Sequence, residues 1–190
     1  MHTHPIENQT FGKIDFTTET FSIGDYEKCV FSQCNFANVD ISGCNFSECE
    51  FVGCNMSMTK MIDTALRDVK FRDCKLMGIP FGNCDGFLFA VGFTNCMMNL
   101  SSFHSLKMKK TEFSDCSLQE TSFVDTDLSS AIFHNCDLLQ AVFQNTNLEK
   151  ADLRTALNYS INPETNKIKK AKFSLAGIRG LLDAYDIEIS

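Results

Sequence analysis

Ten cysteines in a chain of 190 residues are the side chains with the most obvious chemistry, because thiols can form disulfides or bind zinc. No two of them make a C-x-x-C pair, and no histidine lies close enough in the sequence to complete a zinc site. Each cysteine instead lies two residues before a regularly recurring position that is usually large and apolar. A free cysteine behaves as a small hydrophobic residue. We therefore expect these thiols to pack inside the protein, with no metal and no cofactor bound.

The histidines do not complete a catalytic site. His104 and His134 each follow a large apolar residue directly, and their separation of 30 residues puts them on different sides of a periodic chain. The pattern brings together no nucleophile, base and orienting group. We expect a protein that is not an enzyme.

The recurring apolar position comes once every five residues. In residues 101–153 it falls without a miss on Phe103, Met108, Phe113, Leu118, Phe123, Leu128, Phe133, Leu138, Phe143, Leu148 and Leu153. An α-helix turns by about 100° per residue, so a step of five would carry this apolar set around the helix axis. A straight strand would place successive members on opposite faces. The period of five therefore indicates neither regular element.

A period of five fits a chain that bends once in every unit. Each unit would be a short extended piece, with the small residue and the large one both pointing inward, followed by a two-residue corner. Repeated corners wind the chain into a tube whose coils hydrogen-bond to the coils above and below, as in other solenoids.

Units such as Ala151-Asp152-Leu153 and Cys136-Asp137-Leu138 resemble the A(D/N)LXX consensus of the pentapeptide-repeat proteins. The resemblance covers most of the chain. It implies an all-β solenoid, specifically a right-handed quadrilateral parallel β-helix with four units per coil.

The repeat divides the chain into three parts. Residues 1–10 form an N-terminal lead-in, residues 11–173 form the repeat β-helix, and residues 174–190 form a C-terminal helix and tail. The interval from Phe81 to Leu88 is seven residues, which predicts a two-residue phase shift near 84–87 with Leu88 as the first large residue of the new phase. Gly86 permits the backbone to bulge there. The extra residues make either a tolerated surface insertion or a projecting recognition loop.

The tail is predicted to contain a short α-helix capped by Ser174. One side of that helix carries the apolar residues Leu175, Ile178, Leu181, Leu182 and Tyr185. Because the open end of a solenoid needs covering, these residues are expected to cap the tube. The same surface can pair with a second copy, so we also expect a homodimer.

Acidic side chains dominate the repeat, and the formal net charge is −7. Between Thr111 and Leu148 there is no Lys or Arg, and the acids are Glu112, Asp115, Glu120, Asp125, Asp127 and Asp137. All take outward positions spread over the four sides. An acidic rod is a poor direct nucleic-acid binder, because neutralising phosphates requires bases. These acids form either a solvated surface or a partner-binding surface that occupies a basic groove built for DNA.

The acidic repeat body, together with Ile161-Asn162-Pro163-Glu164 before a short helix, resembles the quinolone-resistance (Qnr-type) and microcin-immunity subgroup. That resemblance implies a non-catalytic, homodimeric DNA mimic that binds DNA gyrase or topoisomerase IV and protects it from poisons. The alternative is a structural or scaffolding solenoid with another protein partner.

No apolar run is long enough to span a bilayer, and residues 1–10 show no hydrophobic signal segment. We expect a cytoplasmic protein without membrane contact.

Overall fold

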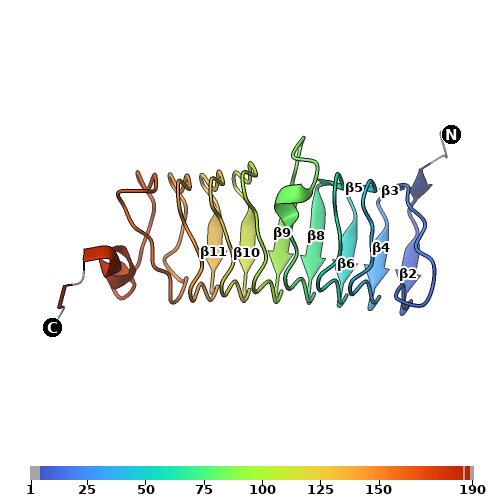
Figure 1. Ribbon diagram of the computed structural model, residues 1–190, viewed down its shortest axis with the longest axis horizontal. Helices are drawn as coiled ribbons and strands as arrows, with labels where there is room; N and C mark the ends of the chain where they lie inside the picture. Colours follow the sequence, from blue (N-terminus) through green and yellow to red (C-terminus); the bar gives the residue numbers. More distant parts are fainter. Residues whose placement is uncertain (1–4, 186, 189–190) are drawn as a thin grey trace.

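The computed structural model, which describes residues 5–185 and 187–188, is a parallel β-solenoid drawn out into a rod with its termini at opposite ends (Figure 1). Short strands alternate with corners along the whole rod, and every strand pair is parallel. The strands are β1 (Ile6–Glu7), β2 (Thr10–Gly12), β3 (Asp25–Glu27), β4 (Val30–Ser32), β5 (Asn45–Ser47), β6 (Glu50–Val52), β7 (Ala65–Arg67), β8 (Val69–Arg72), β9 (Val91–Thr94), β10 (Glu112–Ser114) and β11 (Ile132–His134). The helical pieces are the 3-10 turns η1 (Phe81–Asn83), η2 (Ile178–Leu181) and η3 (Asp183–Tyr185).

The tube has four sides, which we number in the order in which the chain visits them. The first side carries β1, β3, β5 and β7 and continues through the bridged residues Lys107, Asp127, Asn147 and Lys167. The second side carries β2, β4, β6, β8, β9, β10 and β11. The third side runs through the bridged residues Asp15, Asn35, Asn55, Lys75, Met97, Ser117, Asp137 and Leu157, and the fourth runs through Asp40, Lys60, Pro80, Ser102, Ser122 and Val142.

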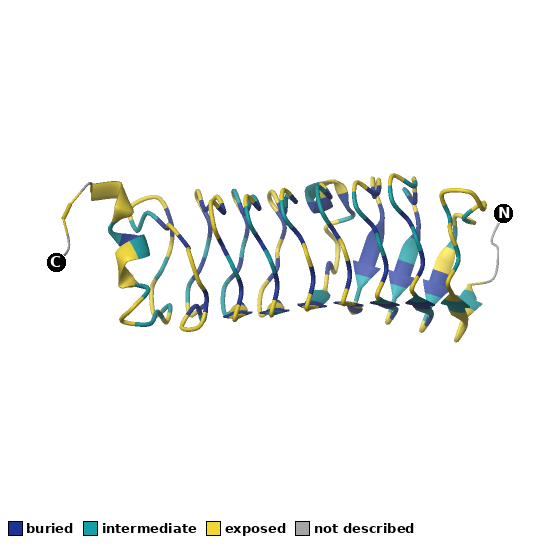
Figure 2. Ribbon diagram, turned by 90° about the horizontal axis from the view of Figure 1, so that it is seen from below, coloured by how far each residue is buried: buried dark blue, intermediate teal, exposed yellow. Residues whose placement is uncertain are grey.

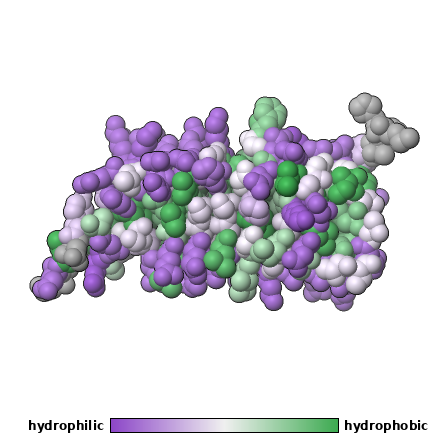
Figure 3. All heavy atoms as spheres, viewed as in Figure 1, coloured by the Kyte–Doolittle hydropathy of each residue, from purple (hydrophilic) through white to green (hydrophobic). Residues whose placement is uncertain are grey.

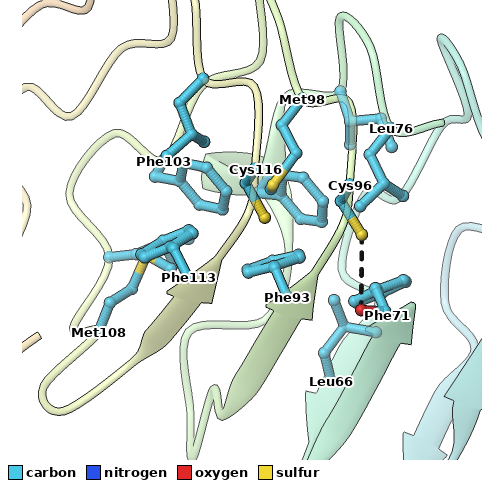
Figure 4. Packing of buried hydrophobic residues seen from close by; sticks show 14 of the residues in the cluster. Leu66, Phe71, Leu76, Phe93, Cys96, Met98, Phe103, Met108, Phe113 and Cys116 are labelled. Atoms are coloured by element: carbon cyan, nitrogen blue, oxygen red, sulfur yellow. Dashed lines mark hydrogen bonds between the residues drawn. The ribbon is translucent and has the colours of Figure 1, made fainter. Parts of the chain in front are cut away.

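The interior is filled by columns of side chains in register, as the period of five predicts. Phe11 pairs with Phe31, and the same column continues through Phe51, Phe71, Phe93, Phe113 and Phe133. Neighbouring rings in this column stack 4.8–5.3 Å apart. Figure 4 shows Phe71, Phe93 and Phe113 of this column beside the thiols of Cys96 and Cys116, and Figure 2 shows buried residues recurring in the coils along the rod.

All ten cysteines are buried free thiols in the small interior position. The Cys96 thiol donates to the Phe71 carbonyl oxygen across 3.5 Å, and the Cys136 thiol donates to the Phe113 carbonyl oxygen across 3.4 Å. The prediction that the thiols pack as small core residues is confirmed.

The corners require left-handed backbone, and the chain places mostly non-glycine residues there. Asp73, Asp115 and Asp125 have φ values of 54°, 55° and 57°. Asp and Asn tolerate this region better than most side chains do. The corners therefore also present carboxylate and amide side chains on the outside of the tube.

The two extra residues lie between Asp85 and Val91. Ala65 is bridged to Asp85, at a separation of 20 residues, but Val69 pairs with Val91, at a separation of 22. The expectation that Leu88 begins the new phase is wrong, because Leu88 is 65% exposed and Phe89 is the buried residue. Gly86, which follows Asp85, offers no side chain to the interior, and Phe89 supplies one instead.

The expectation of an α-helix in the tail is also wrong, because η2 and η3 are 3-10 turns. Gly177 and Gly180 weaken helix formation there. Gly180 is also held against the last coil, where its carbonyl accepts a 2.8 Å hydrogen bond from Ile161 N–H. Ser174 does accept a hydrogen bond from Gly177 N–H, as the capping prediction requires.

Candidate partner-binding surfaces

The six acids predicted to bind a partner surround the tube. Glu112 lies on the second side in β10, Asp127 lies on the first side, and Asp137 lies on the third side. The other three, Asp115, Glu120 and Asp125, occupy three different edges at left-handed corners. The structure therefore does not gather the six into one site.

Most of these carboxylates are bonded to an amide one coil further along. Asn135 donates to Asp115 across 3.1 Å, Asn145 donates to Asp125 across 3.2 Å, and Asn147 donates to Asp127 across 3.1 Å. In-register coils are about 4.8 Å apart, so two stacked carboxylates would repel each other strongly. The alternation of Asp with Asn removes that repulsion and fixes the orientation of each acid.

Asp127 and Asp137 are the most constrained of the six. Partial burial works to raise the pKa of Asp137, but hydrogen bonds from Asn158 and Gln119 outweigh it and lower that pKa. The pKa of Asp127 is lowered in the same way, against partial burial, by Ser129 and by Lys109, whose Nζ lies 3.5 Å from the carboxylate. Both carboxylates are therefore ionised at neutral pH.

Acids and bases are distributed unequally between the sides of the tube, which the sequence analysis missed. The third and fourth sides, with the edges that adjoin them, form what we call the acidic half. Its acids are Asp15, Glu19, Asp40, Asp63, Asp73, Asp115, Glu120, Asp125, Asp137 and Glu164, and its bases are Lys13, Lys60 and Lys75. The remaining bases of the coils lie on the first and second sides and on the edge between them. The signal was in the sequence, because a residue's position within the 20-residue coil assigns its side.

Apolar side chains accompany the acids on this half. Met58 and Leu100 are each 58% exposed on the edge between the third and fourth sides, and Met97 and Leu139 are exposed on the third side. Such a mixture of fixed charges and scattered apolar groups suits a protein surface as partner.

The five tail residues predicted to form a dimer contact separate into two kinds. Leu181 is buried against the last coil, and Leu182 is half-buried, so these two cap the tube. Leu175 is 91% exposed, and Ile178 and Tyr185 are exposed as well. The tail thus covers the end of the tube and presents three apolar side chains outward.

Within the described parts of the chain, no three His, Cys, Asp or Glu residues are grouped so as to hold a metal ion. In the same residues, no helix is long and apolar enough to cross a membrane.

Two family models match parts of the chain. Residues 25–86 match a model described as pentapeptide repeat region, and residues 90–160 match one described as the luminal domain of SV2A/B/C. The chain has the pentapeptide-repeat fold. No curated protein matches the chain by sequence.

Solved structures of QnrB1, described as a plasmid-mediated fluoroquinolone resistance protein, share the fold. A trypsin-treated variant superposes with a TM-score of 0.73 at 18% identity, covering 98% of this chain and 92% of that one. Full-length QnrB1 superposes with a TM-score of 0.64 at 14% identity, covering 97% of this chain and all of that one. The predicted similarity to pentapeptide-repeat proteins of the Qnr type is confirmed as a similarity of repeat and fold.

Proposed function

We propose that this protein is a non-catalytic, cytoplasmic binding protein whose acidic half occupies the basic DNA-binding groove of DNA gyrase or topoisomerase IV and protects the enzyme from a poison. The scarcity of bases on the third and fourth sides, where ten acids are accompanied by only Lys13, Lys60 and Lys75, carries the proposal. The fold shared with QnrB1, a fluoroquinolone resistance protein, adds support.

The physical basis is complementarity of charge between a rigid rod and a groove. The Asp–Asn pairs hold the carboxylates in fixed places, so little conformational entropy is lost when they meet a basic surface. Complementary fields accelerate association, and salt screens that acceleration. The acidic half itself is unsuited to direct nucleic-acid binding, because phosphates would be repelled.

Reversal of charge on the acidic half tests the proposal. We expect Asp115→Lys, Glu120→Lys and Asp125→Lys together to abolish gyrase binding and protection in a quinolone-induced DNA cleavage assay. The matched control is Glu48→Lys, Asp68→Lys and Glu112→Lys, which makes the same change of charge at exposed positions outside the acidic half. Both variants should keep the β-rich circular dichroism spectrum. Unaltered cleavage when the wild-type protein is added would reject the proposal.

The alternative is a scaffolding solenoid that binds another protein. The mixture of Met97, Leu100 and Leu139 with the acids favours protein contact of either kind. The two functions separate in a binding assay with purified gyrase, since a scaffold for another partner would show no affinity for it.

A further inference from the structure

The edge between the first and second sides carries two features that the proposed function does not use. One is the insertion between Asp85 and Val91, and the other is a row of lysines in the C-terminal coils. We propose that this edge binds the surface of an anionic lipid bilayer, with Phe87 and Leu88 entering the interfacial region and the lysines contacting the headgroups.

The insertion presents an apolar tip. Phe87 and Leu88 are 68% and 65% exposed, and together they form what we call the apolar knob. The loop of residues 86–90 projects above its neighbours in Figure 1, and apolar atoms project at the same place in Figure 3. Single exposed apolar residues are ordinary, but two adjacent large ones on a projecting loop indicate a binding contact.

The knob is held rigidly. Phe89 anchors the loop in the core, and Phe87 N–H donates a 2.9 Å hydrogen bond to the Asp85 carboxylate. Arg67 holds the same carboxylate across 3.2 Å. A tip fixed in this way loses little entropy when it is buried in a partner.

The lysines follow the knob along the same edge. Residues Phe89 to Gly92 line one hollow together with Lys70, Lys109 and Lys110 and the acids Asp68 and Glu112, so the insertion lies directly beside the first lysines. The corner positions then continue through Ser130 and Lys150 to Lys170. We call the following exposed side chains the lysine row: Lys107, Lys109, Lys110, Lys150, Lys167, Lys169, Lys170 and Lys172.

Most of the lysine row has no counterion on the protein. Lys109 pairs with Asp127, and Lys172 lies 3.7 Å from Asp152. Among the described residues, the other members of the row make no ion pair. Lys150 N–H bonds to the Lys169 carbonyl, which places Lys150 and Lys170 on adjacent coils at the same corner. Two stacked ammonium groups repel, and an external anionic surface relieves that repulsion.

A bilayer is the partner that uses both features. Apolar groups enter the boundary between headgroups and acyl chains, while each lysine near an anionic leaflet adds about fivefold to the affinity. Nucleic acid would use the lysine row but would leave the knob in water. The expectation of no membrane contact rested on the absence of a spanning segment, and a bilayer bound at an edge needs none. The acidic half faces away from this edge, so both surfaces can be occupied together.

The test uses the full chain and sedimentation with vesicles. We expect binding to vesicles of equal parts phosphatidylcholine and phosphatidylglycerol, little binding to phosphatidylcholine alone, and weakening by salt. Phe87→Ser with Leu88→Asn should reduce the affinity at least tenfold. Lys110→Gln, Lys150→Gln and Lys170→Gln together should reduce it about 100-fold at low salt.

Matched controls lie on the acidic half. Met58→Asn with Leu100→Asn removes two exposed apolar residues at left-handed corners, and Lys60→Gln with Lys75→Gln removes two bases. Both controls should leave vesicle binding unchanged. Failure of the wild-type protein to bind anionic vesicles, or equal losses in the controls, would overturn the proposal. Binding to a short DNA duplex that needs the lysine row but not the knob would identify nucleic acid as the occupant instead, and would overturn it as well.

Discussion

At the scale of the residue, the stability of the protein depends on the aromatic rings and thiols that fill the interior of the tube. Phe113 stacks on Phe93 at 5.3 Å and on Phe133 at 4.9 Å, and it meets Phe103 and Phe123 edge-on at 6.1 Å. Close packing of this kind leaves no room for a side chain to shift into a gap.

Phe113→Ala should therefore lower the free energy of unfolding by about 3–5 kcal/mol, since neighbouring coils cannot collapse into the cavity. The measurement is urea denaturation followed by circular dichroism, because the chain has no Trp. Phe87→Ala, at an exposed ring, is the control and should change the free energy by about 0.5 kcal/mol or less. Equal effects of the two changes would contradict the assignment of Phe113 to the core.

Because of the buried thiols, the free energy of unfolding should decrease at alkaline pH. Burial raises the pKa of Cys49 to about 11 and that of Cys84 to about 12, from 9.0 in an unperturbed thiol. Above pH 9.0 the unfolded chain loses these protons while the folded chain keeps them. The contribution to stability is thus complete below pH 9.0 and is lost as the pH rises toward 11 and 12. Urea midpoints across this range should fall less steeply for Cys49→Ala with Cys84→Ala than for the wild-type protein.

At the scale of the element, the regular coils end where the tail packs against the last coil. The tail packs so closely that a Cβ at Gly180 would overlap the Tyr159 carbonyl oxygen. Leu181 then reaches the core and closes the end of the tube.

Gly180→Ala should detach the tail from the last coil, because backbone cannot yield as a flexible side chain can. We expect faster hydrogen exchange at Ile161 N–H, whose acceptor is the Gly180 carbonyl, and earlier proteolysis within the tail. Gly24→Ala is the control, since a Cβ at Gly24 meets nothing within 4 Å. Unchanged exchange at Ile161 in Gly180→Ala would show that the tail is not held there.

The regular elements were predictable from the sequence, and the irregular ones were predictable only in part. The columns of Phe113, Phe123 and Phe133 were predictable, because a strict period leaves one geometry in which all of them face inward. The two-residue phase shift was predictable from the interval, but the residue that resumes the pattern was not, since Leu88 and Phe89 are both large and apolar. The packing of η2 against the last coil was not predictable, because Gly180 meets Tyr159, which is distant in the sequence. Among the candidate site residues, outward placement was predictable, but the grouping into an acidic half required the coil register across the 22-residue interval.

At the scale of the whole molecule, the tail caps the C-terminal end of the rod and carries outward apolar side chains. Leu175, Ile178 and Tyr185 together can meet the same surface of a second copy, as a two-fold interface requires. We therefore propose that the homodimer expected from the sequence is joined at the C-terminal ends.

Deletion of residues 175–190 should convert that dimer to monomers, as measured by light scattering. A milder variant, Leu175→Asp with Ile178→Asp, keeps Leu181 in place and should give the same result without opening the tube. A dimer that persists in both variants would refute the assignment of the interface to the tail.

Because the coils stack in register, the length of the rod depends on the number of coils. Each coil contacts only the coils next to it, so a duplicated segment 112–131 would extend the rod by about 4.8 Å and leave every other coil in its own surroundings. The apolar knob would then stand further from the tail. The number of coils therefore sets the distance between the apolar knob and the tail, and duplication or loss of a single coil changes that distance by one coil spacing.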